Sequence, residues 1–115
     1  MKDYINLYDY FDYRDFLSDY YVARKARDKN FSYRYFAMKA GYNSSGLYSS
    51  VVQSKVSLTE KTIPKFTKAL QLSDIEEDYF RLMVDFTHAL ISKEKQEIFD
   101  EMLPFLPKKV QKLKD

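Results

Sequence analysis

The chain contains no cysteine and has only two glycines and three prolines among its 115 residues. Without cysteine, disulfide bonds and thiolate metal sites are excluded. Two glycines cannot build a glycine-rich phosphate loop, and so few turn-forming residues disfavour β-hairpins. No apolar run approaches the roughly 18 residues of a membrane span, and the N-terminal "MKDYINLYDYFDY" is too often interrupted by Asp and Asn to be a signal peptide. A cytoplasmic protein without a membrane segment is therefore expected.

Apolar and aromatic side chains are plentiful, at 45% and 17% of the residues, which is enough for one domain with a real core. Helical spacing of these side chains recurs along nearly the whole chain. The first expected helix starts after Asp12. The others are expected at about residues 32–40, 44–53, 59–70, 73–90 and 93–103. The sequence therefore predicts a compact all-α domain of five to six helices.

Several residues predict where these helices begin and end. Ser73 and Glu76 form a capping-box pattern, and Gly41 can adopt the left-handed conformation that ends a helix. Pro64 lies near the start of its helix, which must therefore begin late or bend. The last two helices are expected to bury Ile75, Tyr79, Leu82, Met83, Phe86 and Leu90, and Ile98, Phe99, Met102 and Leu103.

The segment "FAMKAGYNSSGLYSSVVQSK", residues 36–55, has the spacing of a helix-turn-helix. Its turn is expected at Gly41 to Asn43. Within this turn, Tyr42 is expected to fill the gap after Gly41. The inner face of the pair is expected to contain Phe36, Ala37, Ala40, Leu47 and Val51, with Ala37 as the small residue where the helices cross. The second helix of the pair contains no lysine and no arginine, which is unusual for a helix that enters the major groove of DNA.

Charge is distributed unevenly along the chain. Residues 1–31 carry six basic and six acidic side chains, and residues 32–66 carry five basic and one acidic. Residues 67–103 carry four basic and nine acidic side chains, and residues 104–115 carry four basic and one acidic. The positive charge over the predicted helix-turn-helix is the kind of field that attracts phosphate, although an ordinary solvated surface is the alternative interpretation.

Four motifs, "FDYRDFL", "FSYRYFAMKAGY", "SLTEK" and "LSDIEEDYF", give residues 8–103 a family resemblance. The chain resembles the N-terminal region of a bacterial family of proposed transcriptional regulators. In that family a helical module similar to lambda-repressor-like (Xre-type) domains precedes a larger C-terminal domain of unknown role. We accordingly expect a helix-turn-helix domain over residues 1–106 with an aromatic arm at 1–11, and a basic tail or the start of a linker at 107–115.

A DNA-binding function would use two sets of side chains. The candidates for contact with base edges are Asn43, Ser44, Ser45, Tyr48, Ser49 and Gln53. The candidates for contact with phosphates are Arg24, Lys25, Arg27, Arg34, Lys39 and Lys55. Ser44 or Ser45 could instead only cap the following helix. If about four phosphates are neutralised, log affinity should fall against log salt with a slope of about −3 to −4.

Ten of the eleven tyrosines lie in the first 48 residues. Tyr13, Tyr20 and Tyr42 are assigned to the core, whereas the arm tyrosines would pack either on this domain or on a partner. Candidate contacts for a homodimer or a partner protein are Tyr4, Ile5, Leu7, Tyr8, Phe105 and Leu106. A protein-interaction module that uses this arm and the acidic helices is therefore the alternative to a DNA-binding module.

Catalysis is not expected, because the only histidine, His88, has no cysteine or phosphate loop to act with. The acidic residues Glu76, Glu77 and Asp78 are explained by the helix dipole. No cofactor and no metal are expected.

Overall fold

The computed structural model describes residues 4–108 and 111, and over these residues the chain is helical without any strand. The α-helices are α1 (Tyr13–Arg27), α2 (Tyr33–Ala40), α3 (Leu47–Val52), α4 (Ile63–Ala69), α5 (Asp74–His88) and α6 (Ser92–Met102). Two 3₁₀ turns, η1 (Leu7–Asp9) and η2 (Leu103–Phe105), flank them. The predicted all-α class is confirmed. The predicted tail at 107–115 lies largely outside the described residues.

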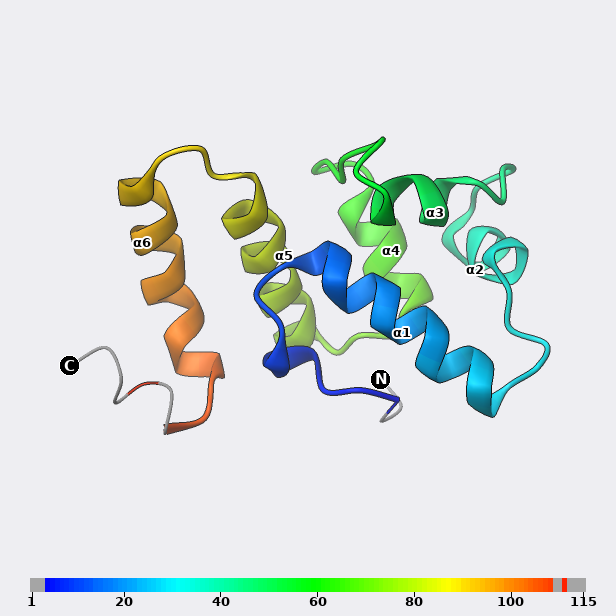
Figure 1. Cartoon of the computed structure of the whole chain (residues 1–115), viewed down its shortest axis with the longest axis horizontal. Helices are drawn as coiled ribbons and strands as arrows, with labels where there is room; N and C mark the ends of the chain where they lie inside the picture. Colours follow the sequence, from blue (N-terminus) through cyan, green and yellow to red (C-terminus); the bar gives the residue numbers. More distant parts are fainter. Residues whose placement is uncertain (1–3, 109–110, 112–115) are drawn as a thin grey trace.

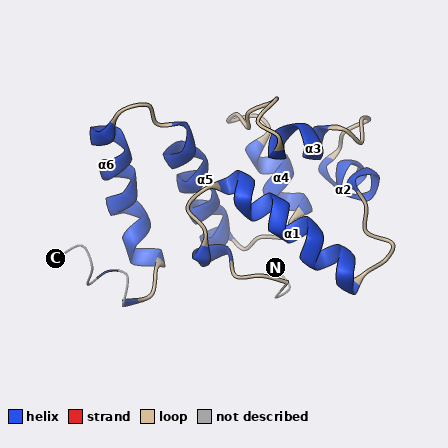
Figure 2. Ribbon diagram, in the orientation of Figure 1, coloured by secondary structure: helices blue, strands red, loops and turns tan. Residues whose placement is uncertain are grey.

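The helices form an elongated molecule of 45 × 28 × 23 Å. Helices α1 to α4 gather in one half, α5 packs against α1 and α4, and α6 lies outermost against α5 (Figure 1). Only loops and turns connect the helices (Figure 2). The basic segment 32–66 therefore lies in the half formed by α1 to α4, whereas most of the acidic segment 67–103 forms α5 and α6.

Side-chain caps define the starts of several helices. Asp12 accepts a hydrogen bond from the Arg14 amide at 2.7 Å, and the predicted capping box of Ser73 and Glu76 is formed in both directions. Helix α4 begins late, at Ile63, with Pro64 in its first turn. The late start, rather than a bend, is therefore how the chain accommodates this proline.

Helices α2, α3 and α4 end in the same way, with a left-handed residue just beyond the helix. These residues are Gly41 (φ 83°), Ser54 (φ 63°) and Gln71 (φ 60°). In each case the following amide donates to a carbonyl five residues back: Tyr42 to Ala37 at 2.8 Å, Lys55 to Ser50 at 2.9 Å and Leu72 to Thr67 at 3.0 Å. This is the Schellman pattern. Only Gly41 was predicted, because serine and glutamine rarely adopt this conformation.

The core is largely aromatic. Its fully buried rings include Tyr13, Phe16, Tyr20, Phe31, Phe36, Tyr48, Phe66, Tyr79 and Phe80. The core assignments of Tyr13 and Tyr20 are confirmed, and Tyr42 is half-buried. Ala37 is 5% exposed, so its predicted burial is confirmed.

Two residues predicted to be buried by α5 are exposed instead. Ile75 is 65% exposed and Leu90 is 92% exposed. Leu90 lies beyond the last residue of α5, His88, so helical spacing no longer directs its side chain. Ile75 lies in the first turn of α5, where no described segment covers it. Phe80 and Val84 are buried on this helix in addition to the predicted Tyr79 and Met83.

The N-terminal arm packs on its own domain. The ring centroids of Tyr4 and Tyr20 are 5.7 Å apart, and those of Tyr8 and Tyr79 are 5.1 Å apart. The Tyr79 hydroxyl donates to the Tyr10 carbonyl at 2.6 Å. The sequence left open whether the arm covers this domain or a partner, and the structure favours the domain because the rings fill its surface.

This arrangement corrects part of the predicted partner surface. Leu7 and Leu106 are 1% and 5% exposed, so neither can contact another chain in this fold. Tyr8 and Phe105 stack on each other with centroids 6.4 Å apart. The apolar side chains proposed for a partner are thus used inside the domain, because burying them there removes the same surface from water.

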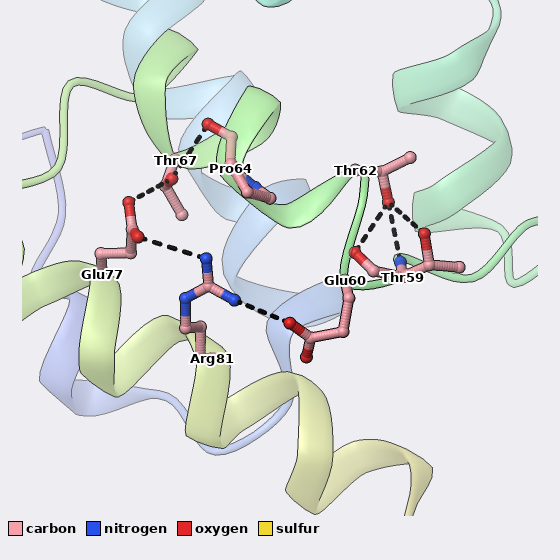
Figure 3. Close-up of polar contacts among 7 residues, drawn as sticks. All are labelled: Thr59, Glu60, Thr62, Pro64, Thr67, Glu77 and Arg81. Atoms are coloured by element: carbon pink, nitrogen blue, oxygen red, sulfur yellow. Dashed lines mark hydrogen bonds and ion pairs between the residues drawn. The ribbon is translucent and has the colours of Figure 1, made fainter.

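A polar chain connects α4 to α5 (Figure 3). The buried Thr67 hydroxyl donates to Glu77 Oε2 at 2.7 Å, and the other oxygen of Glu77 lies 3.4 Å from Arg81 Nη2. Arg81 Nη1 lies 3.3 Å from Glu60, just before α4. Thr62 accepts from the Thr59 amide at 2.7 Å and closes the same turn. These contacts fix the start of α4 over α5.

Candidate nucleic-acid interface

Helix α3 is shorter than predicted, and its tyrosine points inward. It runs from Leu47 to Val52 rather than over residues 44–53, and residues 41–46 connect it to α2 in place of a turn at Gly41 to Asn43. Tyr48 is 1% exposed, and its hydroxyl donates to the Leu17 carbonyl of α1. The prediction that Tyr48 contacts bases is therefore wrong. Its ring packs 4.7 Å from Phe36, where it stabilises the junction of α1, α2 and α3.

The other base-edge candidates remain on the surface. Asn43, Ser44, Ser45 and Gln53 are exposed, and Ser49 is half-buried. Ser44 accepts a hydrogen bond from the Gly46 amide at 3.2 Å, so it closes the turn before α3 without capping the helix itself. Gln53 Nε2 donates to Ser49 Oγ at 3.0 Å. The amide of Gln53, just beyond α3, and the hydroxyl of Ser49 therefore already bond to each other.

A surface hollow of about 530 Å³ lies between α2 and the 41–46 connection. Its lining includes Arg34 from the first turn of α2 and Asn43 and Ser45 from the connection. Tyr42 also lines it, and its hydroxyl is buried without a hydrogen-bond partner among the described residues. Burial raises the pKa of this hydroxyl, which stays a neutral donor at pH 7. One predicted phosphate contact and two predicted base contacts thus share a single depression.

Of the remaining basic candidates, Lys55 is exposed just beyond α3, next to Gln53. Arg24 and Lys25 are engaged inside the domain instead. The Arg24 guanidinium lies 4.3 Å from the Phe31 ring centre and donates to the Tyr20 hydroxyl at 2.9 Å. Lys25 Nζ donates to the Phe31 carbonyl at 2.7 Å. Both residues hold the end of α1 against the loop before α2, away from α3.

Arg27 and Lys39 also lie away from the hollow of Arg34. Arg27 sits 5.6 Å from the Tyr4 ring centre. Lys39 follows Arg34 by five positions, which turns it by about 140° around α2. Its Nζ is 5.6 Å from the Tyr35 ring centre. The structure therefore brings two of the six basic candidates, Arg34 and Lys55, beside the base-edge candidates.

Arg14 is a functional position that was not among the residues predicted from the sequence. Its Nη1 donates to the carbonyls of Val51 and, at 3.1 Å, Val56, and its Nη2 donates to Ser57 Oγ at 3.2 Å. Arg14 thus joins the first turn of α1 to the end of α3 and to the loop that follows. No local signal could have found it, because its acceptors lie about 40 residues away in the chain.

The segment around this surface contains no carboxylate. Residues 29–59 include Lys29, Arg34, Lys39 and Lys55 and not one Asp or Glu. The acidic residues of segment 67–103 belong mostly to α5 and α6, in the other half of the molecule (Figure 1). Segment 29–59 therefore contributes only positive side-chain charges to this surface, while the whole chain has a formal net charge of +2.

No protein-family model, curated protein or solved structure matches this chain. Within the described part of the chain, no helix is long and apolar enough to cross a membrane. The same residues contain no group of three or more His, Asp or Glu side chains placed to hold a metal ion.

Proposed function

We propose that this chain is a bacterial, cytoplasmic transcription-regulator module whose α2–α3 segment acts as a helix-turn-helix and binds duplex DNA weakly. The observation that carries the proposal is the hollow in which Arg34 meets Asn43 and Ser45. A cation suited to phosphate lies there beside an amide and a hydroxyl suited to base edges, in a segment without carboxylates. The resemblance to the lambda-repressor-like modules leads to the same function.

The side chains have distinct roles in this proposal. Arg34 and Lys55 bind phosphates on either side of α3 and supply most of the affinity. Asn43 can pair with adenine through both ends of its amide, and Ser45 can bond to a base edge or to a phosphate. Gln53 joins them once it releases Ser49. Because α3 contributes so few polar side chains, discrimination among sequences is expected to be modest.

Salt dependence provides the direct test. Two phosphates neutralised by each chain give a slope of log affinity against log salt of about −2, shallower than the −3 to −4 expected from the sequence for about four phosphates. Fluorescence anisotropy with random and selected duplexes at several salt concentrations measures this slope, and sedimentation counts the chains on each duplex. Arg34→Gln should weaken binding to all sequences and flatten the slope by about one unit.

The matched control is Lys93→Gln, which removes the same charge from an exposed position on α6. This variant should bind DNA like the wild type. Equal weakening by both variants would mean that net charge alone attracts DNA, and absence of binding at low salt would reject the function.

The alternative is a protein-interaction module. Most of the N-terminal arm packs inward, but the loop between α5 and α6 exposes Leu90 (92%) and Ile91 (57%) next to the acidic residues of α6. Phe11, at the end of the arm, is 39% exposed and contacts the rings of Phe86 and Phe99. Exposed apolar residues of this kind favour contact with another protein. Binding through them should persist as salt rises, and Leu90→Ser should abolish it while leaving DNA binding unchanged.

A further inference from the structure

A second, smaller hollow of about 230 Å³ lies where the C-terminal parts of α1, α2 and α4 meet. It is lined by Arg24, Tyr35, Lys39, Lys68, Ala69 and Gln71. Three of these side chains are cationic and none is acidic. Lys68 and Ala69 place this hollow at the end of α4, which points away from α3 (Figure 1). It shares Tyr35 with the hollow of Arg34, Asn43 and Ser45, and none of its other lining residues.

Arg24 provides a donor that the fold leaves unused. Its Nη1 donates to Tyr20, but its Nε is buried and has no hydrogen-bond partner within the described residues. Buried donors are nearly always paired in folded proteins, so an unpaired one calls for an acceptor that the chain does not supply. The rings of Phe31 and Tyr35, 4.3 and 5.6 Å from the guanidinium, hold Arg24 in place without any carboxylate.

Gln71 adds a second indication. Its φ of 60° is in the left-handed region, where glycine is comfortable and a glutamine is strained. The conformation itself belongs to the Schellman end of α4, and it places the residue beside the hollow. Gln71 lines the hollow, and a side-chain amide can donate hydrogen bonds to an anion.

We propose that this hollow binds a phosphate group. Lys39, Lys68 and the Arg24 guanidinium neutralise its charge, and the Gln71 amide donates a hydrogen bond to its oxygens. The volume suits a phosphate with a small substituent and not a bulky ligand. The phosphate belongs either to a free phosphorylated small molecule or to the backbone of a bound nucleic acid, and the position away from α3 favours the free molecule.

Isothermal titration with pyrophosphate, in a buffer without phosphate, tests the site. Lys68→Gln should weaken binding about tenfold, the usual effect of losing one hydrogen bond to a charged group. Lys61→Gln is the matched control, since it removes an exposed lysine just before the opposite end of α4, outside the hollow. Lys39→Gln should weaken binding like Lys68→Gln, and thermal melts verify that each variant is folded. Equal affinities in Lys68→Gln and Lys61→Gln, or no binding by the wild type at millimolar pyrophosphate, would overturn the proposal.

A competition arm identifies the source of the phosphate and separates this site from the proposed DNA surface. Pyrophosphate should saturate the hollow without displacing a labelled duplex, and Lys68→Gln should leave duplex affinity unchanged. Displacement that is lost in Lys68→Gln would assign the phosphate to the DNA backbone. Pyrophosphate binding without any duplex binding would reject the DNA function and support the hollow.

Discussion

Arg14 offers the sharpest test of how α3 is held in place. Arg14→Ala removes the donors to the carbonyls of Val51 and Val56 and to Ser57. At roughly 1 kcal/mol for each bond at this half-buried position, the loss should be about 2–3 kcal/mol. For a domain of this size that lowers the melting temperature by about 8–12 °C. Arg14→Lys should recover only part of the lost stability, because an ammonium cannot form the planar fork that reaches all three acceptors.

Arg81→Ala is the matched control for this experiment. Arg81 also contacts two groups, Glu60 at 3.3 Å and Glu77 at 3.4 Å, but the Glu60 side chain is 85% exposed. Surface ion pairs contribute about 0–1 kcal/mol, so this variant should melt within a few degrees of the wild type. The comparison requires only circular-dichroism melts of the three proteins. If Arg14→Ala and Arg81→Ala melt at the same temperature, Arg14 does not hold α3 against α1.

Three further predictions follow from single residues. Gln71→Gly should raise the free energy of unfolding by about 0.5–1 kcal/mol, because the relief of left-handed strain exceeds the entropy that glycine adds to the unfolded chain. The urea midpoint should rise accordingly, and a lower midpoint would contradict this. Tyr48→Ala should lower the free energy of unfolding by about 3–5 kcal/mol because of the cavity it leaves. Tyr48→Phe should be more stable than Tyr48→Ala, and it should bind DNA with the same sequence preference as the wild type. His88 lies 2.9 Å from the Tyr13 hydroxyl, and burial, then the charge of Arg14, lowers its pKa. His88 therefore binds a proton more readily in the unfolded chain than in the folded one. Its contribution to the free energy of unfolding is fully present above about pH 6.5 and is lost as the pH falls through the lowered pKa. Urea midpoints at pH 7.5 and pH 5 should differ less in His88→Gln than in the wild type, and an unchanged difference would contradict the assignment.

The features that could be predicted from the sequence have their physical causes within a few residues. Asp12 and Ser73 cap amides two or three positions ahead, and Gly41 ends its helix through its own backbone freedom. Such contacts are fully specified by the local residues. The concentration of acidic residues in α5 and α6 also follows from the sequence, because these residues are close together in the chain.

Helix α3 shows where this approach fails. Gly46 precedes it without a side-chain cap, so nothing in the sequence indicated that it begins at Leu47 and not three residues earlier. Tyr48 was therefore assigned to the exposed side, although its hydroxyl has an acceptor, the Leu17 carbonyl, 31 residues away. Polar tips of tyrosine are buried where such an acceptor exists, and helical spacing alone cannot reveal one.

Long-range contacts account for the remaining differences. Arg14 meets the end of α3, and Arg24 meets Lys39 and Lys68, only after α1, α2 and α4 have packed. Ile75 has the spacing of a core residue on α5 but no neighbour above it. Helical periodicity gives the direction of a side chain, whereas the presence of a covering element depends on the tertiary structure.

The most direct test of the proposed function is a map of amide chemical shifts as a short duplex is added to the isotope-labelled protein at low salt. The proposal predicts the largest changes at residues 32–34 and 43–45, smaller ones at 49–55, and none along α6. Changes concentrated at Leu90 and Ile91, or no changes at all, would contradict DNA binding through the α2–α3 segment.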